Sequence, residues 1–226
     1  MAHYYNCLRI FFSWLKREDF ISENPIARIS KPRKEQKVIR ALSTEQIRAL
    51  FKLCPSKTST GARNLAIVMM LLDSGMRVSE LANLQLDDID PESGAILIRQ
   101  AKGKKQRVVR IGSATQKAVW RYRTLHRKGD SDRLFLGIHG RPLDSDAIEL
   151  IVRRLGKKAG ILGVHAHRLR HTFAISFLRS GGDVFSLKYL LGHSSLTMVA
   201  NYLSSLSSED AIRAHKRFSP LDNVKF

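Results

Sequence analysis

The chain has few cysteines and no long apolar run, and each shortage narrows the kind of protein it can be. Only Cys7 and Cys54 occur, at no metal-ligand spacing, so we expect no structural disulfide and a reducing, cytoplasmic setting. The longest apolar run, Leu65–Leu72, is far shorter than the roughly 20 residues that span a bilayer. Lys16 and Arg17 follow the N-terminal apolar residues without a small-residue cleavage site, so we expect neither a secretory signal nor a membrane span.

Acidic side chains are also scarce, because 20 Asp and Glu stand against 39 Lys and Arg and the net charge is +19. A surplus of that size repels itself in the folded state and is best explained by a polyanionic partner. Nucleic acid is the first candidate, and an anionic membrane surface is the second. The sequence contains no Gly-x-x-x-x-Gly-Lys loop for a nucleotide, and its 43% of hydrophobic residues is enough for a buried core.

The first 38 residues differ from the rest of the chain. Residues 4–16 predict one amphipathic helix, which is too short to bury its apolar face alone and therefore needs partners from a larger domain. Asn24-Pro25 predicts a turn, and the segment 28–37 holds five cations and Pro32. This segment is a basic linker, either a solvated loop or a strap along DNA phosphates.

From Ala41 onward the pattern is regular and predicts a mainly α domain over residues 39–226 with one small antiparallel β-hairpin (α+β). Ser43 to Gln46 is a capping-box sequence, and Gly75 can end a buried helix as a left-handed cap. Two strands flank a turn and a third short strand follows, at 95–99, 107–111 and 134–136. The predicted helices span 43–53, 63–73, 79–84, 113–126, 144–158, 167–179, 183–191, 195–203 and 208–217.

The segment from His165 to His171, with the sequence His-Ala-His-Arg-Leu-Arg-His, concentrates side chains that could handle a phosphate. On a helix, His167, Arg170 and His171 lie at i, i+3 and i+4 and share a face. Arginine offers a bidentate fork to phosphate oxygens, and histidine exchanges protons near neutral pH. The face could instead contact DNA without chemistry. The i, i+4 histidines also allow a zinc interpretation, but Arg168 stands where a zinc helix has glutamate, and the positive surroundings oppose a divalent cation.

Four other positions point to chemistry only when they are taken together. Arg77 follows a buried helix and could pair with Glu80 or reach solvent. Lys102 lies at the tip of the basic hairpin, where a solvated side chain is the plainer interpretation. His193 ends a Leu-Leu-Gly-His run, and Tyr202 follows nine residues later, where a packed ring is the plainer interpretation. A phenol is a weak nucleophile at neutral pH unless cations and a base surround it.

In this order and spacing, the segments resemble the tyrosine recombinase family, also called the phage integrase family. The set consists of Gly-Met-Arg77-Val-Ser-Glu-Leu, a basic hairpin with Lys102, His167-Arg-Leu-Arg170-His, Leu-Gly-His193 and Tyr202. Each piece is common alone, whereas the ordered set is specific. The resemblance implies that residues 39–226 form the family's catalytic domain with a C-terminal tail helix. It also implies that residues 1–38 are the end of a helical, SAM-like core-binding domain plus the basic linker.

The resemblance further implies a reaction and a role for each residue. Tyr202 would attack the scissile phosphate and form a 3′-phosphotyrosyl bond, without metal, cofactor or ATP. Arg77 and Arg170 would clamp the non-bridging oxygens, and His193 would hydrogen-bond the phosphate. Lys102 would protonate the departing 5′ oxygen, with two further lysines as neighbours on the same turn. His167 would assist proton transfer as a base near the nucleophile.

The implied partner is double-stranded DNA at a specific recombination site, bound by a homotetramer whose subunits are monomers when free. This places the protein in the cytoplasm with the nucleoid, and the helix 208–217 could dock on a neighbouring subunit or on its own chain.

Three other functions compete with recombination. A type IB topoisomerase shares the chemistry without exchanging strands, and a degenerate relative binds DNA without cutting it. A metal-dependent nuclease would use the acidic run 87–90, which more simply forms the polar turn before the hairpin.

Overall fold

The computed structural model describes residues 2–30, 40–99, 106–193 and 195–203, together with 206, 207, 209, 210, 212 and 215. Contacts divide the chain into two compact units, Met1–Val38 and Ile39–Phe226. Across these described stretches, no helix is both long enough and apolar enough to cross a membrane.

The first unit is one helix with a turn folded against it. α1 (Ala2–Arg17) is followed by a bend in which the Trp14 and Phe20 rings lie 5.8 Å apart between centroids. The hydroxyl of Tyr5 donates a hydrogen bond to the carbonyl of Ile29 at 2.9 Å and closes the turn. Trp14 and Phe20 nevertheless remain 43% and 69% exposed, so this short unit leaves part of its apolar face uncovered.

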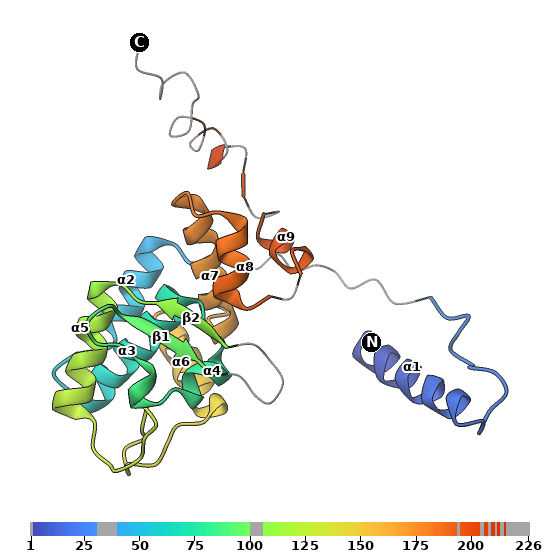
Figure 1. Cartoon of the computed structure of the whole chain (residues 1–226), viewed down its shortest axis with the longest axis horizontal. Coiled ribbons are helices and arrows are strands. Elements are labelled where there is room, and N and C mark those ends of the chain that lie inside the picture. Colours follow the sequence, from blue (N-terminus) through green and yellow to red (C-terminus); the bar gives the residue numbers. More distant parts are fainter. Residues whose placement is uncertain are drawn as a thin grey trace. The chain divides into compact units, whose positions relative to one another are not determined.

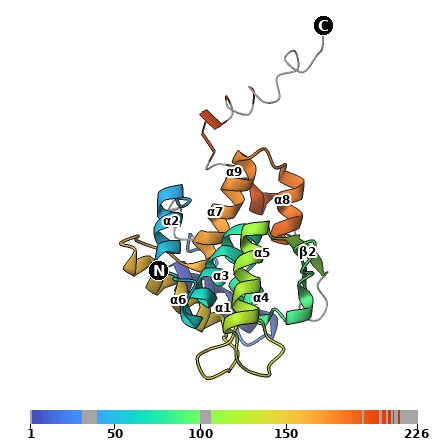
Figure 2. The same cartoon turned by 90° about the vertical axis from the view of Figure 1, so that its left-hand side faces the viewer.

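The central helix of the second unit is α3 (Ser59–Ser74) (Figures 1 and 2). It contacts α5 (Ser113–Arg121), α6 (Ser145–Lys158) and α7 (Ala166–Arg179). A helix that is apolar on most sides needs neighbours on most sides, which explains this central position. Gly75 ends α3 with a positive φ of 63°, as the sequence predicted for a left-handed cap.

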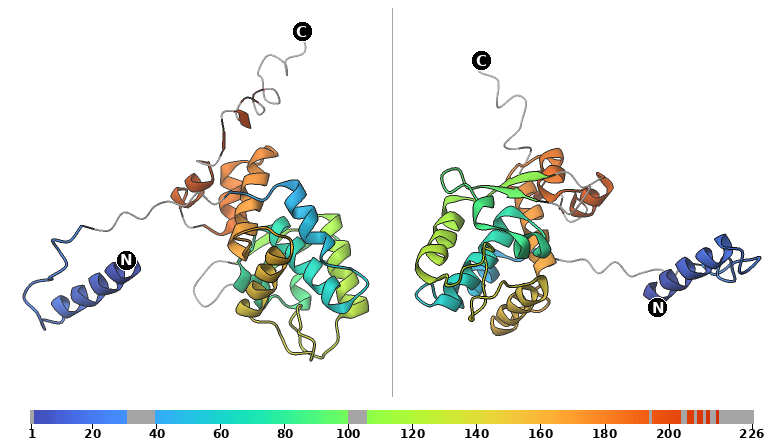
Figure 3. Two further views of the ribbon diagram at one scale, coloured as in Figure 1. Left: turned by 180° about the vertical axis from the view of Figure 1, so that it is seen from behind. Right: turned by 60° about the horizontal axis from the view of Figure 1, so that its bottom comes forward.

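The hairpin and the remaining helices complete the second unit. The bounds are α2 (Thr44–Lys52), α4 (Val78–Asn83), a 3-10 turn (Leu86–Asp88), β1 (Ala95–Ile98), β2 (Arg107–Arg110), a π-helical turn (Tyr122–His126), α8 (Val184–Leu191) and α9 (Thr197–Leu203). β1 and β2 form a two-stranded antiparallel sheet in which Ile98 lies opposite Arg107. α7, α8 and α9 pack together at one end of the unit, as Figure 3 shows from two further sides.

Two apolar clusters hold the second unit together. The larger cluster contains side chains from α2, from α7, and from the helices and the hairpin that lie between them in sequence. It includes Ile67, Leu71 and Leu81, all fully buried. The smaller cluster lies between α7, α8 and α9 and consists of Ala174, Ile175, Leu187, Leu191, Val199 and Tyr202. The candidate nucleophile therefore belongs to the smaller cluster.

The mainly α fold with one antiparallel hairpin confirms the predicted fold class, and the predicted capping box is present. Ser43 Oγ accepts from the Gln46 backbone N–H, and the Gln46 side chain accepts from the Ser43 N–H. The predicted strand over 134–136 is wrong, because that segment forms only one isolated bridge, between Leu136 and Pro142. Its amide groups bond instead to the Leu84 carbonyl and the Tyr122 hydroxyl. The predicted helix over 208–217 lies largely outside the described residues.

The central position of α3 predicts a large effect of truncating one of its buried side chains. We expect Ile67→Ala to lower the free energy of unfolding by about 2–5 kcal/mol, because it removes fully buried methyl groups and leaves a cavity. Urea denaturation followed by circular dichroism measures this. Ile138→Ala is the matched control, since Ile138 is 83% exposed and should change stability by no more than about 0.5 kcal/mol. Equal effects of the two substitutions would contradict the packing described.

Candidate active site

The turn after α3 presents Arg77 beside a carboxylate. A side chain at Gly75 would meet the Phe173 ring at 2.2 Å, so the close packing of α7 against this turn requires glycine. Arg77 is the N-cap residue directly before α4, and its N–H and guanidinium donate to the two oxygens of Glu80 at 2.7 and 3.0 Å. A second guanidinium nitrogen donates to the Gly192 carbonyl at 3.3 Å. Its side chain is 41% exposed, so this cation can still be reached from solvent.

Arg170 is the buried cation of the site and lies on α7, only 3% exposed. Its guanidinium donates to the carbonyls of Gly75 and Leu191 at 2.7 and 2.6 Å. The same nitrogen that reaches Leu191 lies 2.9 Å from Nε2 of His193. Burial, and secondarily the neighbouring Arg77, lowers the pKa of Arg170 to about 10, so it remains charged at neutral pH. Within the described residues it forms no ion pair with a carboxylate.

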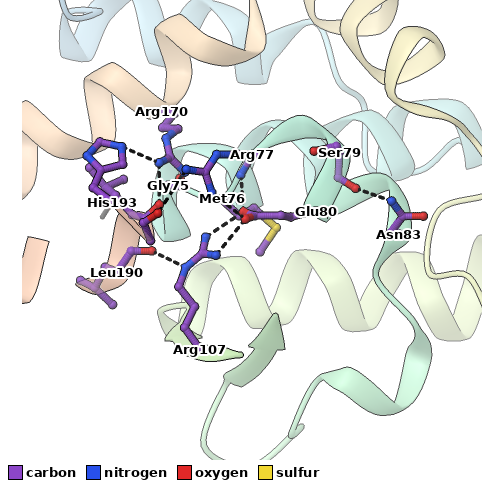
Figure 4. Close-up of polar contacts among 12 residues, drawn as sticks. Gly75, Met76, Arg77, Ser79, Glu80, Asn83, Arg107, Arg170, Leu190 and His193 are labelled. Carbon is purple, nitrogen blue, oxygen red and sulfur yellow. Dashed lines mark hydrogen bonds and ion pairs between the residues drawn. The ribbon is translucent and has the colours of Figure 1, made fainter. Parts of the chain in front are cut away.

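His193 follows the left-handed Gly192 that ends α8, and its ring points to Arg170 (Figure 4). Since a guanidinium can only donate, the Nε2 of His193 is the acceptor in this contact. Burial lowers the pKa of His193 to about 4, and Arg170 and Arg77 contribute to the shift. The imidazole is therefore neutral at pH 7. Its Nδ1 is buried and has no hydrogen-bond partner among the described residues.

Tyr202 lies on α9 with only 6% of its surface exposed. Its ring stacks on His193 with centroids 6.0 Å apart and planes 11° apart. On another side it contacts the ring of His171, at 5.4 Å and 38°. The phenol thus packs against two imidazoles, and one of them is hydrogen-bonded to the buried arginine. His171 was placed on this helix face by the sequence but was not predicted to be a site residue; its i+4 relation to His167 was the available signal.

His167 occupies the first turn of α7 and is exposed to solvent. Partial burial, and then the charge of Arg170, lowers its pKa below the ordinary histidine value, so it is neutral at pH 7 and can accept a proton. The ring contacts described for Tyr202 are with His171 and His193 rather than with His167. The structure therefore brings Arg77, Arg170, His193 and Tyr202 together. Lys102 lies outside the described residues.

Arg107 is a buried cation that the sequence analysis missed. It begins β2, is 4% exposed, and pairs with both oxygens of Glu80 at 2.8 and 2.7 Å. Its Nε also donates to the Leu190 carbonyl at 2.9 Å. Burial tends to raise the pKa of Glu80, but its hydrogen bonds to Arg107 and Arg77 outweigh this and lower it. The available signal was strand alternation, which puts Arg107 on the same inward face as Val109.

A metal-ion arrangement does not occur in the described part of the chain. No three His, Cys, Asp or Glu side chains there are grouped so that they could hold a metal ion. The i, i+4 histidines of α7 take different places: His167 is exposed, whereas His171 lies against Tyr202. The charged groups that meet at this site are therefore mainly guanidiniums, which suit an anionic ligand.

Comparison with known proteins gives the family. The model of the phage integrase family matches residues 40–209. Tyrosine recombinase XerC of Bacillus pumilus is 38% identical over 218 residues, covering 92% of this chain and 70% of that protein. XerA recombinase has a crystal structure that superposes with a TM-score of 0.70 at 35% identity, over 80% of this chain and 65% of that one.

A more distant structure shows the fold alone. The Tn1549 transposon integrase, solved in complex with a circular intermediate DNA, has a TM-score of 0.77 at 21% identity. The match covers 96% of this chain and 78% of that one. The chain therefore belongs to the phage integrase family, and its second unit has the fold of a tyrosine recombinase catalytic domain.

Proposed function

We propose that this chain is a site-specific DNA recombinase that cuts and rejoins DNA strands through a phosphotyrosyl bond on Tyr202. The observation that carries the proposal is the meeting of three groups. The Arg170 guanidinium is hydrogen-bonded to His193, the Arg77 guanidinium is bonded to the adjoining Gly192, and the Tyr202 ring stacks on His193. A phosphodiester held by the two arginines would lie beside the only ring of this cluster that can act as a phenolic nucleophile.

The electrostatics suit phosphoryl transfer. The transition state spreads negative charge over the equatorial phosphate oxygens, and fixed cations aimed at those oxygens stabilise it. Arg170 is held by carbonyl groups rather than by a carboxylate, so most of its charge remains available to a phosphate. Arg77 shares Glu80 with Arg107 and is likewise only partly neutralised. Guanidiniums in this arrangement can provide the charge stabilisation that metal ions supply in many nucleases.

The bonds in the proposed reaction balance without any other reactant. The Tyr202 oxygen forms a bond to phosphorus, the bond from phosphorus to the 5′ oxygen breaks, and the phenolic proton passes to a base that we assign to His167. Lys102 donates a proton to the departing 5′ oxygen, and His193 hydrogen-bonds the phosphate. Rejoining reverses these steps with the 5′ hydroxyl of a second strand. One phosphate ester is exchanged for another, so no nucleotide needs to be hydrolysed.

The proposed partner is double-stranded DNA at a specific recombination site. A net charge of +19 supports a polyanionic partner, and the Tn1549 integrase, which has the same fold, was solved on DNA. We propose that residues 1–38 are the end of a core-binding domain plus a basic linker, and that 39–226 is the catalytic domain with its tail helix. We also propose a homotetramer on DNA, with the protein associated with the nucleoid in the cytoplasm.

One prediction about the reaction concerns the nucleophile. A DNA duplex nicked next to the cleavage site should trap a covalent protein–DNA band that survives denaturant and forms in EDTA. Tyr202→Phe should abolish the band, because a phenylalanine has no oxygen to attack phosphorus. Tyr189→Phe is the matched control, since Tyr189 is 58% exposed on α8 and should leave the band unchanged. A covalent band that persists in Tyr202→Phe, or one that EDTA abolishes, would refute the mechanism.

Another prediction concerns the two arginines, Arg77 and Arg170, that are proposed to hold the phosphate. Arg170→Lys should reduce the single-turnover rate of covalent band formation by about 100- to 1,000-fold, because a lysine cannot reproduce the guanidinium fork. Arg153→Lys is the matched control, since the Arg153 side chain is 63% exposed on α6 and should retain the wild-type rate. Similar rates for the two variants would show that Arg170 does not act on the phosphate.

A further prediction concerns the neutral histidine, His193. An unfolded histidine protonates near pH 6.5, whereas the pKa of folded His193 is lowered to about 4. Between these values the unfolded chain binds more protons, so the free energy of unfolding should fall as pH drops from about 6.5 toward about 4. Urea denaturation at several pH values measures the slope, which should be shallower in His193→Asn. The exposed control His139→Asn should keep the wild-type slope; identical slopes in all three proteins would contradict the burial described.

A further inference from the structure

Arg107 is the more enclosed of the two guanidiniums described in contact with Glu80. Its side chain is 3% exposed, against 41% for Arg77. It forms two short bonds to Glu80 and a third to the Leu190 carbonyl, which together use all three of its nitrogens. Because two of these nitrogens bind a carboxylate, the charge of Arg107 is paired within the protein, and we assign it no direct contact with a DNA phosphate. Its effect on the reaction must pass through the groups it holds.

The first of these groups is Glu80, which is shared between two guanidiniums (Figure 4). Oε1 accepts from Arg107 at 2.8 Å and from Arg77 at 3.0 Å. Without Arg107 the full charge of this carboxylate would be directed at Arg77, which would then form an ordinary neutralised ion pair. Because Arg107 takes part of that charge, Arg77 keeps a net attraction for a phosphate while its orientation remains fixed.

The second group is the turn that carries His193. Arg107 Nε binds the Leu190 carbonyl at the end of α8, and its guanidinium packs on Gly192, where an added Cβ would lie 3.0 Å from it. Gly192 in turn accepts the bond from Arg77. One buried side chain therefore contacts both the partner of Arg77 and the backbone immediately before His193.

We propose that Arg107 is a positioning residue for strand cleavage, holding Arg77 through Glu80 and His193 through the 190–192 turn, without touching DNA. This rests on the proposed function of the site. Arg107 also begins the strand that follows the segment containing Lys102, so a route through leaving-group protonation is the competing explanation. Only the second explanation predicts that the cleavage rate of an Arg107 variant depends on whether the leaving group needs a proton.

The test compares Arg107→Lys with Arg110→Lys in the full chain. Arg110 is an exposed arginine on the same strand whose Nε donates to the Ser93 carbonyl, and so serves as the matched control. We expect Arg107→Lys to slow single-turnover covalent band formation by about 100-fold, because a displacement of Arg77 and His193 by about 1 Å would lower the cleavage rate by that factor. DNA affinity should change by less than about threefold, since the enclosed arginine contributes no phosphate contact. Arg110→Lys should retain the wild-type cleavage rate.

A substrate with sulfur in place of the bridging 5′ oxygen separates the two routes, because a thiolate leaves without being protonated. We expect the roughly 100-fold deficit of Arg107→Lys to persist on this substrate. Recovery of the wild-type rate there would overturn the proposal in favour of the leaving-group route. A second variant, Glu80→Gln, should lose rate as well, and combining it with Arg107→Lys should cost far less than the product of the two single losses.

Three further results would overturn the proposed role of Arg107. If the rate of Arg107→Lys falls only in proportion to the folded fraction measured by circular dichroism, Arg107 is merely structural and the proposal is overturned. Wild-type cleavage by Arg107→Lys overturns it as well, while leaving the proposed function intact. A wild-type chain that forms no phosphotyrosyl band on its cognate DNA removes the proposed function itself, and the role of Arg107 with it.

Discussion

The active-site end of the second unit depends on one buried cation, Arg170. Moving a guanidinium out of water costs several kcal/mol unless its donors find partners. Here the partners are the carbonyls that end α3 and α8, together with the ring of His193. The C-terminal ends of helices carry partial negative charge, so this cation lies where two helix dipoles favour it. The two helix ends must therefore stay in place for the arginine to remain buried, which fixes the geometry of the site.

The same arrangement leaves the site positively charged. One carboxylate, Glu80, is shared by Arg77 and Arg107, while Arg170 is satisfied by carbonyl dipoles instead of a full negative charge. A site with several fixed guanidiniums and one shared carboxylate retains an uncompensated attraction for an anion. The pKa of His193 is lowered by this field as well as by burial, so the imidazole beside the arginines stays neutral. The charge and the hydrogen-bonding groups of the site thus both favour an anionic ligand.

Much of the secondary structure could be predicted from the sequence, because it depends on patterns of neighbouring residues. The Ser43–Gln46 capping box, the Gly75 cap and the hairpin depend on neighbouring residues and were found where predicted. The strand at 134–136 was wrong because its amide partners, the Leu84 carbonyl and the Tyr122 hydroxyl, come from distant parts of the chain. Motif order indicated Arg77 and Arg170, and the sequence offered Glu80 as a partner of Arg77, but it did not indicate the carbonyls that hold Arg170.

Arg107 shows most clearly which contacts could not be predicted from the sequence. Its partners, Glu80 and the Leu190 carbonyl, lie 27 and 83 residues away in sequence, so no short pattern contains the contact. His171 was visible as a member of a helix face, but its contact with Tyr202 depends on where α9 packs. Residue types can be read from a single sequence, whereas the pairing of buried charges requires the tertiary fold.

The separation of the two apolar clusters has a consequence for how the nucleophile can move. The buried side chains described on α9 are Val199 and Tyr202, and both belong to the small cluster with α7 and α8. Among the described residues of α9, detaching the helix would remove these two buried side chains from the smaller cluster, and neither of them belongs to the larger cluster around α3. Local opening of this kind costs far less free energy than global unfolding. The packing that shelters the phenol is thus separate from the packing that holds the larger part of the second unit together.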